Sequence, residues 1–137
     1  MKFIVIATRF TYNKEEKLKS RKLIEHLFSK GKSFSAFPLK VLYDFVDDKE
    51  TPLQAGVTTS SRHFKKAVER NRVKRVMREA YRLQKIPLQE TLVLKQKSLI
   101  LFFIYVGKEL PDFADANKKM QLILLKLSNL LDQQIEN

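Results

Sequence analysis

The sequence contains no cysteine, which excludes a disulfide framework, a thiolate nucleophile and a cysteine-ligated zinc site. Histidine is scarce, because only His26 and His63 are present and neither has a second histidine or a paired carboxylate at ligand spacing. The three glycines, at positions 31, 56 and 107, are too far apart to form a glycine-rich phosphate loop. We therefore expect no catalytic group and no metal site of its own in this chain.

Long apolar runs are also missing, since no stretch approaches the roughly 20 apolar residues that a membrane-spanning helix requires. The apolar run near the start, Phe3–Ala7, is too short for the core of a signal peptide. These absences lead us to expect a soluble, cytoplasmic protein with no membrane partner. A chain of 137 residues is long enough for one domain with a hydrophobic core, spanning 1–137, in which 1–16 form a flexible N-terminal extension.

Positive charge is abundant and unevenly distributed. The formal net charge is +12 and the sequence pI is about 10.0, which favours an anionic partner, nucleic acid before an acidic membrane surface. Residues 62–85 hold ten Lys and Arg against two Glu, so two thirds of the net charge lies in this segment. Such a concentration is typical of an electrostatic binding surface.

The spacing within this segment predicts a two-sided helix from about Lys66 to about Lys85, entered through a loop that spans Ser60–Lys65. Ser60 or Ser61 is a candidate cap for an earlier start. The apolar stripe consists of Val73, Val76, Met77, Ala80, Tyr81 and Leu83. The opposite side carries Arg70, Asn71, Arg72, Lys74, Arg75, Arg78, Arg82 and Lys85. A solvated amphipathic helix is the alternative, but such helices usually alternate the sign of their charges, and this one hardly does.

The other patterns predict further helices and strands. A helix capped by Ser20 is expected to run to about Lys30 and to be closed by Gly31. Alternation from Phe34 to Val46 predicts a strand that points Phe37, Leu39, Val41, Tyr43 and Phe45 one way. After a turn over 47–52, the segment 53–59 is expected to return as the second strand of a hairpin, with Gly56 in its middle.

The C-terminal third predicts one strand and one long helix. Residues 86–97 are expected to form a loop punctuated by Pro87, with a helical turn as the alternative. The apolar run 98–106 is expected to form a central strand buried on both faces. After Pro111, apolar residues at three- and four-residue steps predict a helix to near Gln134. The order α-β-β-α-β-α indicates a single small α+β domain, a sheet packed by helices, with a fourth strand if 34–46 breaks at a bend.

The residue types favour nucleic-acid binding over catalysis. Guanidinium groups bind two phosphate oxygens at once, and Asn71 among them adds a donor and an acceptor for a base edge or a sugar hydroxyl. A second basic cluster, Lys17–Lys22, lies near Phe28 and Tyr43, whose rings would stack unpaired bases or else belong to the core. The carboxylates Asp47, Asp48 and Glu50 are interpreted as a solvated turn. If the protein belongs to an enzyme, another component performs the chemistry.

Two adjoining motifs are similar to the bacterial ribonuclease P protein component. They are Ala55-Gly56-Val57-Thr58 and the helix 67–82, which contains Arg70-Asn71-Arg72. The likeness extends to Lys17-Leu18-Lys19, Phe28 and Gly31 and to the C-terminal strand and helix, and covers about 17–131. Ile24 stands where the family often has a second aromatic residue, and Ser61-Arg62 replaces a Lys-Lys pair. Residues 1–13 have no counterpart that we can assign.

The resemblance implies a fold and an activity. The fold is a mostly antiparallel sheet with a left-handed βαβ crossover around the basic helix, as in a known ribosomal protein domain. The activity is the Mg²⁺-dependent endonucleolytic removal of the 5′ leader from precursor tRNA, in which a catalytic RNA subunit holds the Mg²⁺ and the monomeric protein supplies no catalytic group. Residues expected to contact the catalytic RNA are Arg62, Lys65, Lys66, Arg70, Asn71, Arg72, Lys74, Arg75 and Arg78. Residues expected to bind the leader are Lys17, Lys19, Phe28, Lys40 and Tyr43.

Two other classes of function remain open on the sequence. A general RNA-binding module, ribosome-associated or an RNA chaperone, would share the basic helix without a role in tRNA processing. A DNA-binding domain would place the same helix in a major groove. The heavy arginine content without a helix-turn-helix partner argues against the DNA-binding alternative.

Overall fold

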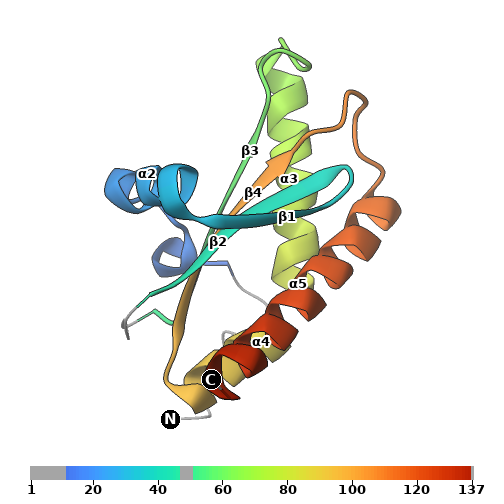
Figure 1. The fold of residues 1–137 in the computed structure, drawn as a ribbon. Coiled ribbons are helices and arrows are strands. Elements are labelled where there is room, and N and C mark those ends of the chain that lie inside the picture. The colour runs from blue at the N-terminus through green and yellow to red at the C-terminus, as the bar shows by residue number, and fades with distance from the viewer. Residues whose placement is uncertain (1–11, 47–50, 137) are drawn as a thin grey trace.

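A four-stranded sheet with helices on both faces organises the structure, a computed structural model that describes residues 12–46 and 51–136 (Figure 1). The elements in chain order are η1 (Lys14–Glu16), α2 (Arg21–Lys30), β1 (Lys32–Ala36), β2 (Leu39–Val46), β3 (Leu53–Thr59), α3 (Ala67–Gln84), α4 (Ile86–Lys95), β4 (Ser98–Tyr105) and α5 (Phe113–Glu136). The chain is thus a single small α+β domain, as the sequence predicts.

The strands lie in the order β1-β2-β4-β3, with β4 in the interior. The β1–β2 and β2–β4 pairs are antiparallel, while β3 and β4 run parallel, so the sheet is mostly antiparallel. Because β3 and β4 are parallel neighbours, the chain must cross over between them, and it does so through α3 and α4. The predicted central strand is confirmed: Leu99, Ile100, Leu101 and Phe103 of β4 are all at most 1% exposed.

The two faces of the sheet carry separate apolar clusters. The larger cluster joins alternate residues of β2, β3 and β4, such as Val41 and Phe103, to α3, α4 and α5. The smaller one joins Leu42 and Ile100, which point the opposite way, to Leu27 of α2. Figure 1 shows this division, with α2 on one side of the sheet and the other long helices on the far side. The sheet therefore separates the basic helix α3 from α2.

The segment 34–46 is two strands, because the chain breaks at Phe37-Pro38, which is joined by a cis peptide bond. Proline lacks the N–H that an interior strand position requires, so a break there is expected. Phe37 lies in this turn and is 68% exposed, so the prediction that it shares one side of a strand with Leu39 and Val41, which are buried, is wrong. The four-stranded alternative is the correct one.

The predicted hairpin of 34–46 with 53–59 is wrong. The hairpin is β1–β2, whereas the strand that pairs with β3 in the described sheet is β4, which lies between β2 and β3. An interior strand needs a partner on each edge, and β4 obtains them from β2 and β3. The carboxylates of the predicted turn, Asp47, Asp48 and Glu50, lie outside the described residues.

The segment predicted as a loop, 86–97, contains the ten-residue helix α4. Pro87 lies in its first turn, where the missing N–H has no intrahelical partner to lose. Gln96 ends the helix in the left-handed region, with φ at 55°.

The predicted helices are otherwise confirmed. Ser20 caps α2, since its side chain accepts a hydrogen bond from the Leu23 N–H at 3.3 Å. The basic helix spans Ala67–Gln84, within a residue of the predicted ends, and α5 spans Phe113–Glu136. Ser60 caps no earlier start: its hydroxyl accepts from the Arg62 N–H at 3.0 Å within the loop.

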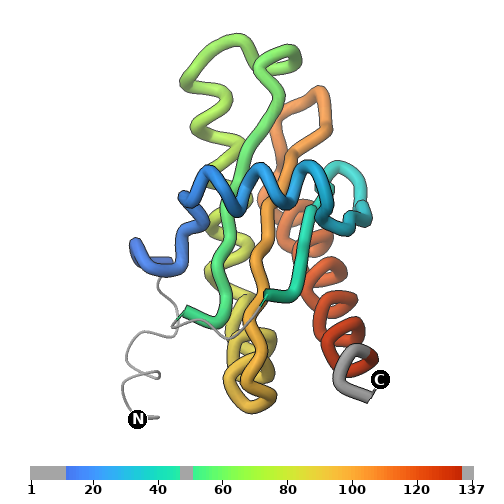
Figure 2. Tube along the Cα trace, turned by 60° about the vertical axis from the view of Figure 1, so that its left-hand side comes forward, coloured from blue at the N-terminus to red at the C-terminus, as the bar shows by residue number. Residues whose placement is uncertain are grey.

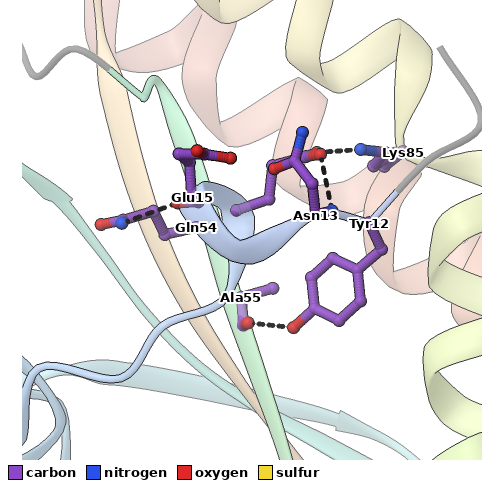
Figure 3. Close-up of polar contacts among 7 residues, drawn as sticks. Tyr12, Asn13, Glu15, Gln54, Ala55 and Lys85 are labelled. Atoms are coloured by element: carbon purple, nitrogen blue, oxygen red, sulfur yellow. Dashed lines mark hydrogen bonds and ion pairs between the residues drawn. The ribbon is translucent and has the colours of Figure 1, made fainter. Parts of the chain in front are cut away.

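Part of the segment predicted as a flexible extension is folded onto the sheet. The Tyr12 hydroxyl donates to the Ala55 carbonyl of β3 (Figure 3). The Tyr12 ring packs edge-on against Tyr81 of α3, with 5.6 Å between the ring centres. The Leu18 N–H also donates to the Ala55 carbonyl, at 2.9 Å. Residues 12–18 therefore join the edge strand β3 to α3, and the prediction for 1–11 falls outside the described residues.

Candidate nucleic-acid interface

The exposure of the cationic side chains of α3 depends on their angular position on the helix. Val73, Met77 and Ala80 define the buried side and are each 0% exposed. Arg70, Lys74 and Arg78 flank that side and are half-buried, while Asn71, Arg72 and Arg75 lie opposite it and are exposed. We call the nine residues of this side and the preceding loop the basic surface: Arg62, Lys65, Lys66, Arg70, Asn71, Arg72, Lys74, Arg75 and Arg78. The structure therefore places all nine predicted RNA-subunit contacts on one helix and the loop that enters it.

The loop 60–66 has a defined conformation. The Phe64 N–H donates to the Ser60 carbonyl at 3.2 Å, and the Phe64 ring, 3% exposed, lies 6.0 Å from the ring of Tyr105. Arg62, Lys65 and Lys66 on either side of this anchor are exposed. The loop thus buries its aromatic residue and presents its cations to solvent.

Two cations that the helical pattern assigned to the basic side have other partners. Lys85 is 0% exposed, and its ammonium group contacts the buried carboxylate of Glu16 (Figure 3). Burial lowers the pKa of Lys85 to about 8. Arg82 pairs with Glu79, and its hydrogen bonds lower the pKa of that carboxyl. The assignment of Lys85 to an exposed phosphate-binding face is wrong.

A second candidate surface lies on the face of the sheet that α2 covers, where α2 packs against β2 and β4 (Figure 2). Phe28 of α2 is 58% exposed, and its ring packs edge-on against Phe102 of β4 at 5.5 Å. Lys40 of β2 lies opposite Ile104 and so shares this face of the sheet with Phe102. His26 Nε2 lies 2.5 Å from Asp44 Oδ2, which ties α2 to β2. This surface combines an exposed ring with a nearby cation.

The remaining predicted leader contacts are not all on this surface. Lys19 is exposed just before α2, and the ammonium group of Lys17 lies 5.6 Å from the centre of the Tyr12 ring. Tyr43 is 7% exposed and belongs to the cluster on the opposite face, where its ring packs against Phe34 at 5.7 Å. The structure brings Phe28 and Lys40 to one face of the sheet and places Tyr43 on the other.

Sequence reasoning missed Phe102 because it lies within an apolar run that was assigned to the core. Phe102 is only partly buried and faces α2. Gly56 on the neighbouring strand leaves room for this ring: a Cβ there would lie 2.8 Å from two Phe102 carbons. Alternate residues of a strand face opposite sides of the sheet, and Ile100, Phe102 and Ile104 share the α2 face. This alternation could have identified Phe102 from the sequence.

The described acidic and histidine side chains near these surfaces are not grouped as metal ligands. Within residues 12–46 and 51–136, no group of three or more His, Asp or Glu side chains is placed to hold a metal ion. None of the helices in these ranges is long and apolar enough to cross a membrane. What the basic surface offers chemically is guanidinium and ammonium donors for phosphate oxygens, with the Asn71 amide among them.

Sequence comparisons give consistent matches. A family model described as Ribonuclease P matches residues 12–128. The chain is 37% identical over 120 residues to a "Ribonuclease P protein component" of Porphyromonas gingivalis, covering 87% of this chain and 88% of that protein. A protein of the same description from Chlorobaculum tepidum is 27% identical over 127 residues, which is 87% of this chain and 79% of that protein.

Solved structures share the fold. A Staphylococcus aureus RNase P protein aligns with a TM-score of 0.62 at 18% identity, over 82% of this chain and 94% of that chain. Another structure from the same organism aligns with a TM-score of 0.54 at 20% identity, over 85% of this chain and 91% of that chain. At these identities the likeness is one of fold.

Proposed function

The chain belongs to the family of the ribonuclease P protein component, and from this premise we propose how it serves a ribonuclease P. Its basic surface binds the catalytic RNA subunit. The face between α2 and the sheet holds the single-stranded 5′ leader of precursor tRNA. The protein thereby assists the endonucleolytic step of tRNA 5′ maturation and contributes no catalytic group.

The observation that carries this proposal is the arrangement of α3. Asn71, Arg72 and Arg75 point away from a side of the helix that is fully buried at Val73 and Met77. Because the buried side is fixed by packing, the exposed side has a fixed orientation, and so do the cations of the loop before it. Cations on a rigid frame suit a folded RNA, whose phosphates also have fixed positions.

The leader is assigned to the α2 face for a different reason. Bases of a single strand are unstacked, and stacking on an aromatic side chain contributes about 1–3 kcal/mol per base. Phe28 offers an exposed ring whose edge-on contact with Phe102 holds it in place, and Lys40 supplies a cation on the same face of the sheet. Tyr43 is left out of this proposal because it is buried on the opposite face.

The mechanism proposed for the protein is electrostatic and geometric. Its cations lower the cost of bringing two polyanions together, and the α2 face holds the leader in register. The magnesium ions are assigned to the RNA subunit, since the donor groups described in this chain do not form a metal site. The benefit of the protein should therefore be greatest when magnesium is limiting.

A processing assay tests the proposal directly. Precursor tRNA is incubated with the cognate RNA subunit at low magnesium, with and without this protein. We expect cleavage at the mature 5′ end to be strongly dependent on the protein at low magnesium and less so as magnesium rises. Protein that binds precursor and mature tRNA equally and leaves cleavage unchanged would instead indicate the alternative, a general RNA-binding module.

A further inference from the structure

Arg70, the first arginine of the Arg-Asn-Arg segment, is bonded to the protein itself. Its Nη1 donates to the carbonyl of Phe64 at 2.9 Å and to the carbonyl of Lys65 at 2.7 Å. Both acceptors belong to the loop before α3, five and six residues earlier in the chain. Arg72, two residues later, is exposed and points away from the buried side of the helix.

The position of Arg70 on the helix favours such a structural contact. It lies in the first turn of α3, where the unpaired N–H groups form the positive end of the helix dipole and a cation is unfavourable. The N-cap residue, Lys66, makes no side-chain hydrogen bond to these N–H groups. The two loop carbonyls offset this cost, because they present partial negative charge to the guanidinium group from outside the helix.

The loop that Arg70 holds carries three of the exposed cations of the basic surface, Arg62, Lys65 and Lys66. Its other described attachments are the buried ring of Phe64 and the hydrogen bonds to Ser60. The guanidinium group of Arg70 donates hydrogen bonds to the carbonyl of Phe64, which is anchored by its buried ring, and to that of the next residue, Lys65. It therefore fixes the backbone from which Lys65 and Lys66 project.

We propose that Arg70 is a positioning residue: it holds the loop 60–66 in its RNA-binding conformation before RNA arrives, whereas Arg72 contacts phosphate directly. The two hydrogen bonds support the role of Arg70 in holding the loop. The expected effect on RNA binding rests on the proposed function. Ordering loop residues on binding costs conformational entropy, so a loop that is already ordered binds more tightly with the same charges.

The first test uses the free protein, without RNA. Backbone hydrogen exchange is measured across 60–66 in wild type, Arg70→Ala, Arg70→Lys and Arg72→Ala. We expect faster exchange at the Arg62 and Phe64 N–H groups in both Arg70 variants, because a lysine keeps the charge but its shorter side chain ends short of the position from which Arg70 Nη1 donates to both carbonyls. Arg72→Ala is the matched control and should exchange as wild type does. Unchanged exchange in both Arg70 variants would overturn the proposal.

The second test measures the affinity for the cognate RNA subunit at several salt concentrations. Arg72→Ala should lower the salt slope by about one, as loss of a phosphate contact does. Arg70→Ala should lose about tenfold or more in affinity while its slope stays close to wild type, because the loop cations still reach phosphates after they are ordered. Arg70→Lys should share this loss. If Arg70→Lys instead bound the RNA subunit as tightly as wild type, only the charge of Arg70 would matter, which would contradict the proposal.

The two tests separate this inference from the proposed function. If wild-type protein fails to bind the RNA subunit in a salt-dependent way, the proposed function fails, while the exchange result still decides whether Arg70 holds the loop. If Arg70→Ala does not fold, Arg70→Lys supplies both measurements, since it retains the charge and most of the side-chain volume.

Discussion

Phe28 is the residue on which the leader-binding proposal depends most. Its ring is 58% exposed and packs edge-on against Phe102. We expect Phe28→Ala to weaken the binding of precursor tRNA by about tenfold, which corresponds to the loss of one stacked base, and to leave mature tRNA unaffected. Fluorescence titration of the holoenzyme with the two RNAs checks this. An equal loss for both would assign Phe28 to a structural role.

Tyr81 carries a buried hydroxyl with no hydrogen-bond partner among the described residues, although the residue is only 1% exposed. An unsatisfied buried hydroxyl costs about 1–3 kcal/mol. We therefore expect Tyr81→Phe to raise the free energy of unfolding by about 1 kcal/mol, because the ring contacts with Tyr12 and Phe103 are retained. Urea denaturation measures the change. A clear loss of stability would mean that the hydroxyl has a partner in solution.

The sequence correctly predicted the exposure of side chains whose environment is determined by the apolar stripe of the helix that carries them. The helical pattern correctly predicted that Asn71, Arg72 and Arg75 are exposed, because the apolar stripe fixes their orientation. It could not predict the burial of Lys85, whose partner Glu16 lies 69 residues earlier in the chain. The contacts of Arg70 were missed for a related reason, since they depend on the fold of the loop rather than on the spacing of the helix.

At the scale of elements, the Glu16–Lys85 pair joins η1 to the end of α3. Removing one partner leaves a buried charge unpaired, so we expect Lys85→Met to lower the free energy of unfolding by about 3–5 kcal/mol. The double variant Glu16→Gln, Lys85→Met should recover most of this loss, since no buried charge remains. Chemical denaturation of the wild type, Glu16→Gln, Lys85→Met and the double variant completes the cycle. A double variant no more stable than Lys85→Met would show that the ion pair is not the cause.

The elements were predicted well and their pairing poorly. The positions of α2, α3, β4 and α5 follow from local periodicity and caps, which the sequence contains. Strand pairing depends on long-range competition, and β4 replaces β2 as the partner of β3. The apolar run of β4 already required a partner on each edge, which the predicted hairpin could not supply. Pro87 was interpreted as part of a loop, although proline is tolerated in the first turn of a helix, where it lies in α4.

For the whole molecule, the tyrosines report on the folded state. Burial raises the pKa of Tyr12 to about 12, that of Tyr81 well above its usual value, and also those of Tyr43 and Tyr105. A raised native pKa contributes stability that is complete below pH 10 and is lost as the pH rises through the native value. We therefore expect stability to fall above pH 10. Tyrosinate absorbance should show native tyrosines titrating later than those in urea, and identical curves would contradict this.

The distribution of charge over the molecule is the central claim, because the account requires the cations of α3 and its loop to bind RNA rather than merely to solvate the protein. The most direct measurement compares Arg72→Ala, Arg75→Ala with a matched double variant of cations outside the basic surface, Lys97→Ala, Lys118→Ala. Both variants lose two charges, so net charge alone predicts equal effects. Affinity for the cognate RNA subunit is measured against salt concentration. The account predicts a slope reduced by about two for the first variant and nearly unchanged for the second. Equal slopes for the two variants would contradict it.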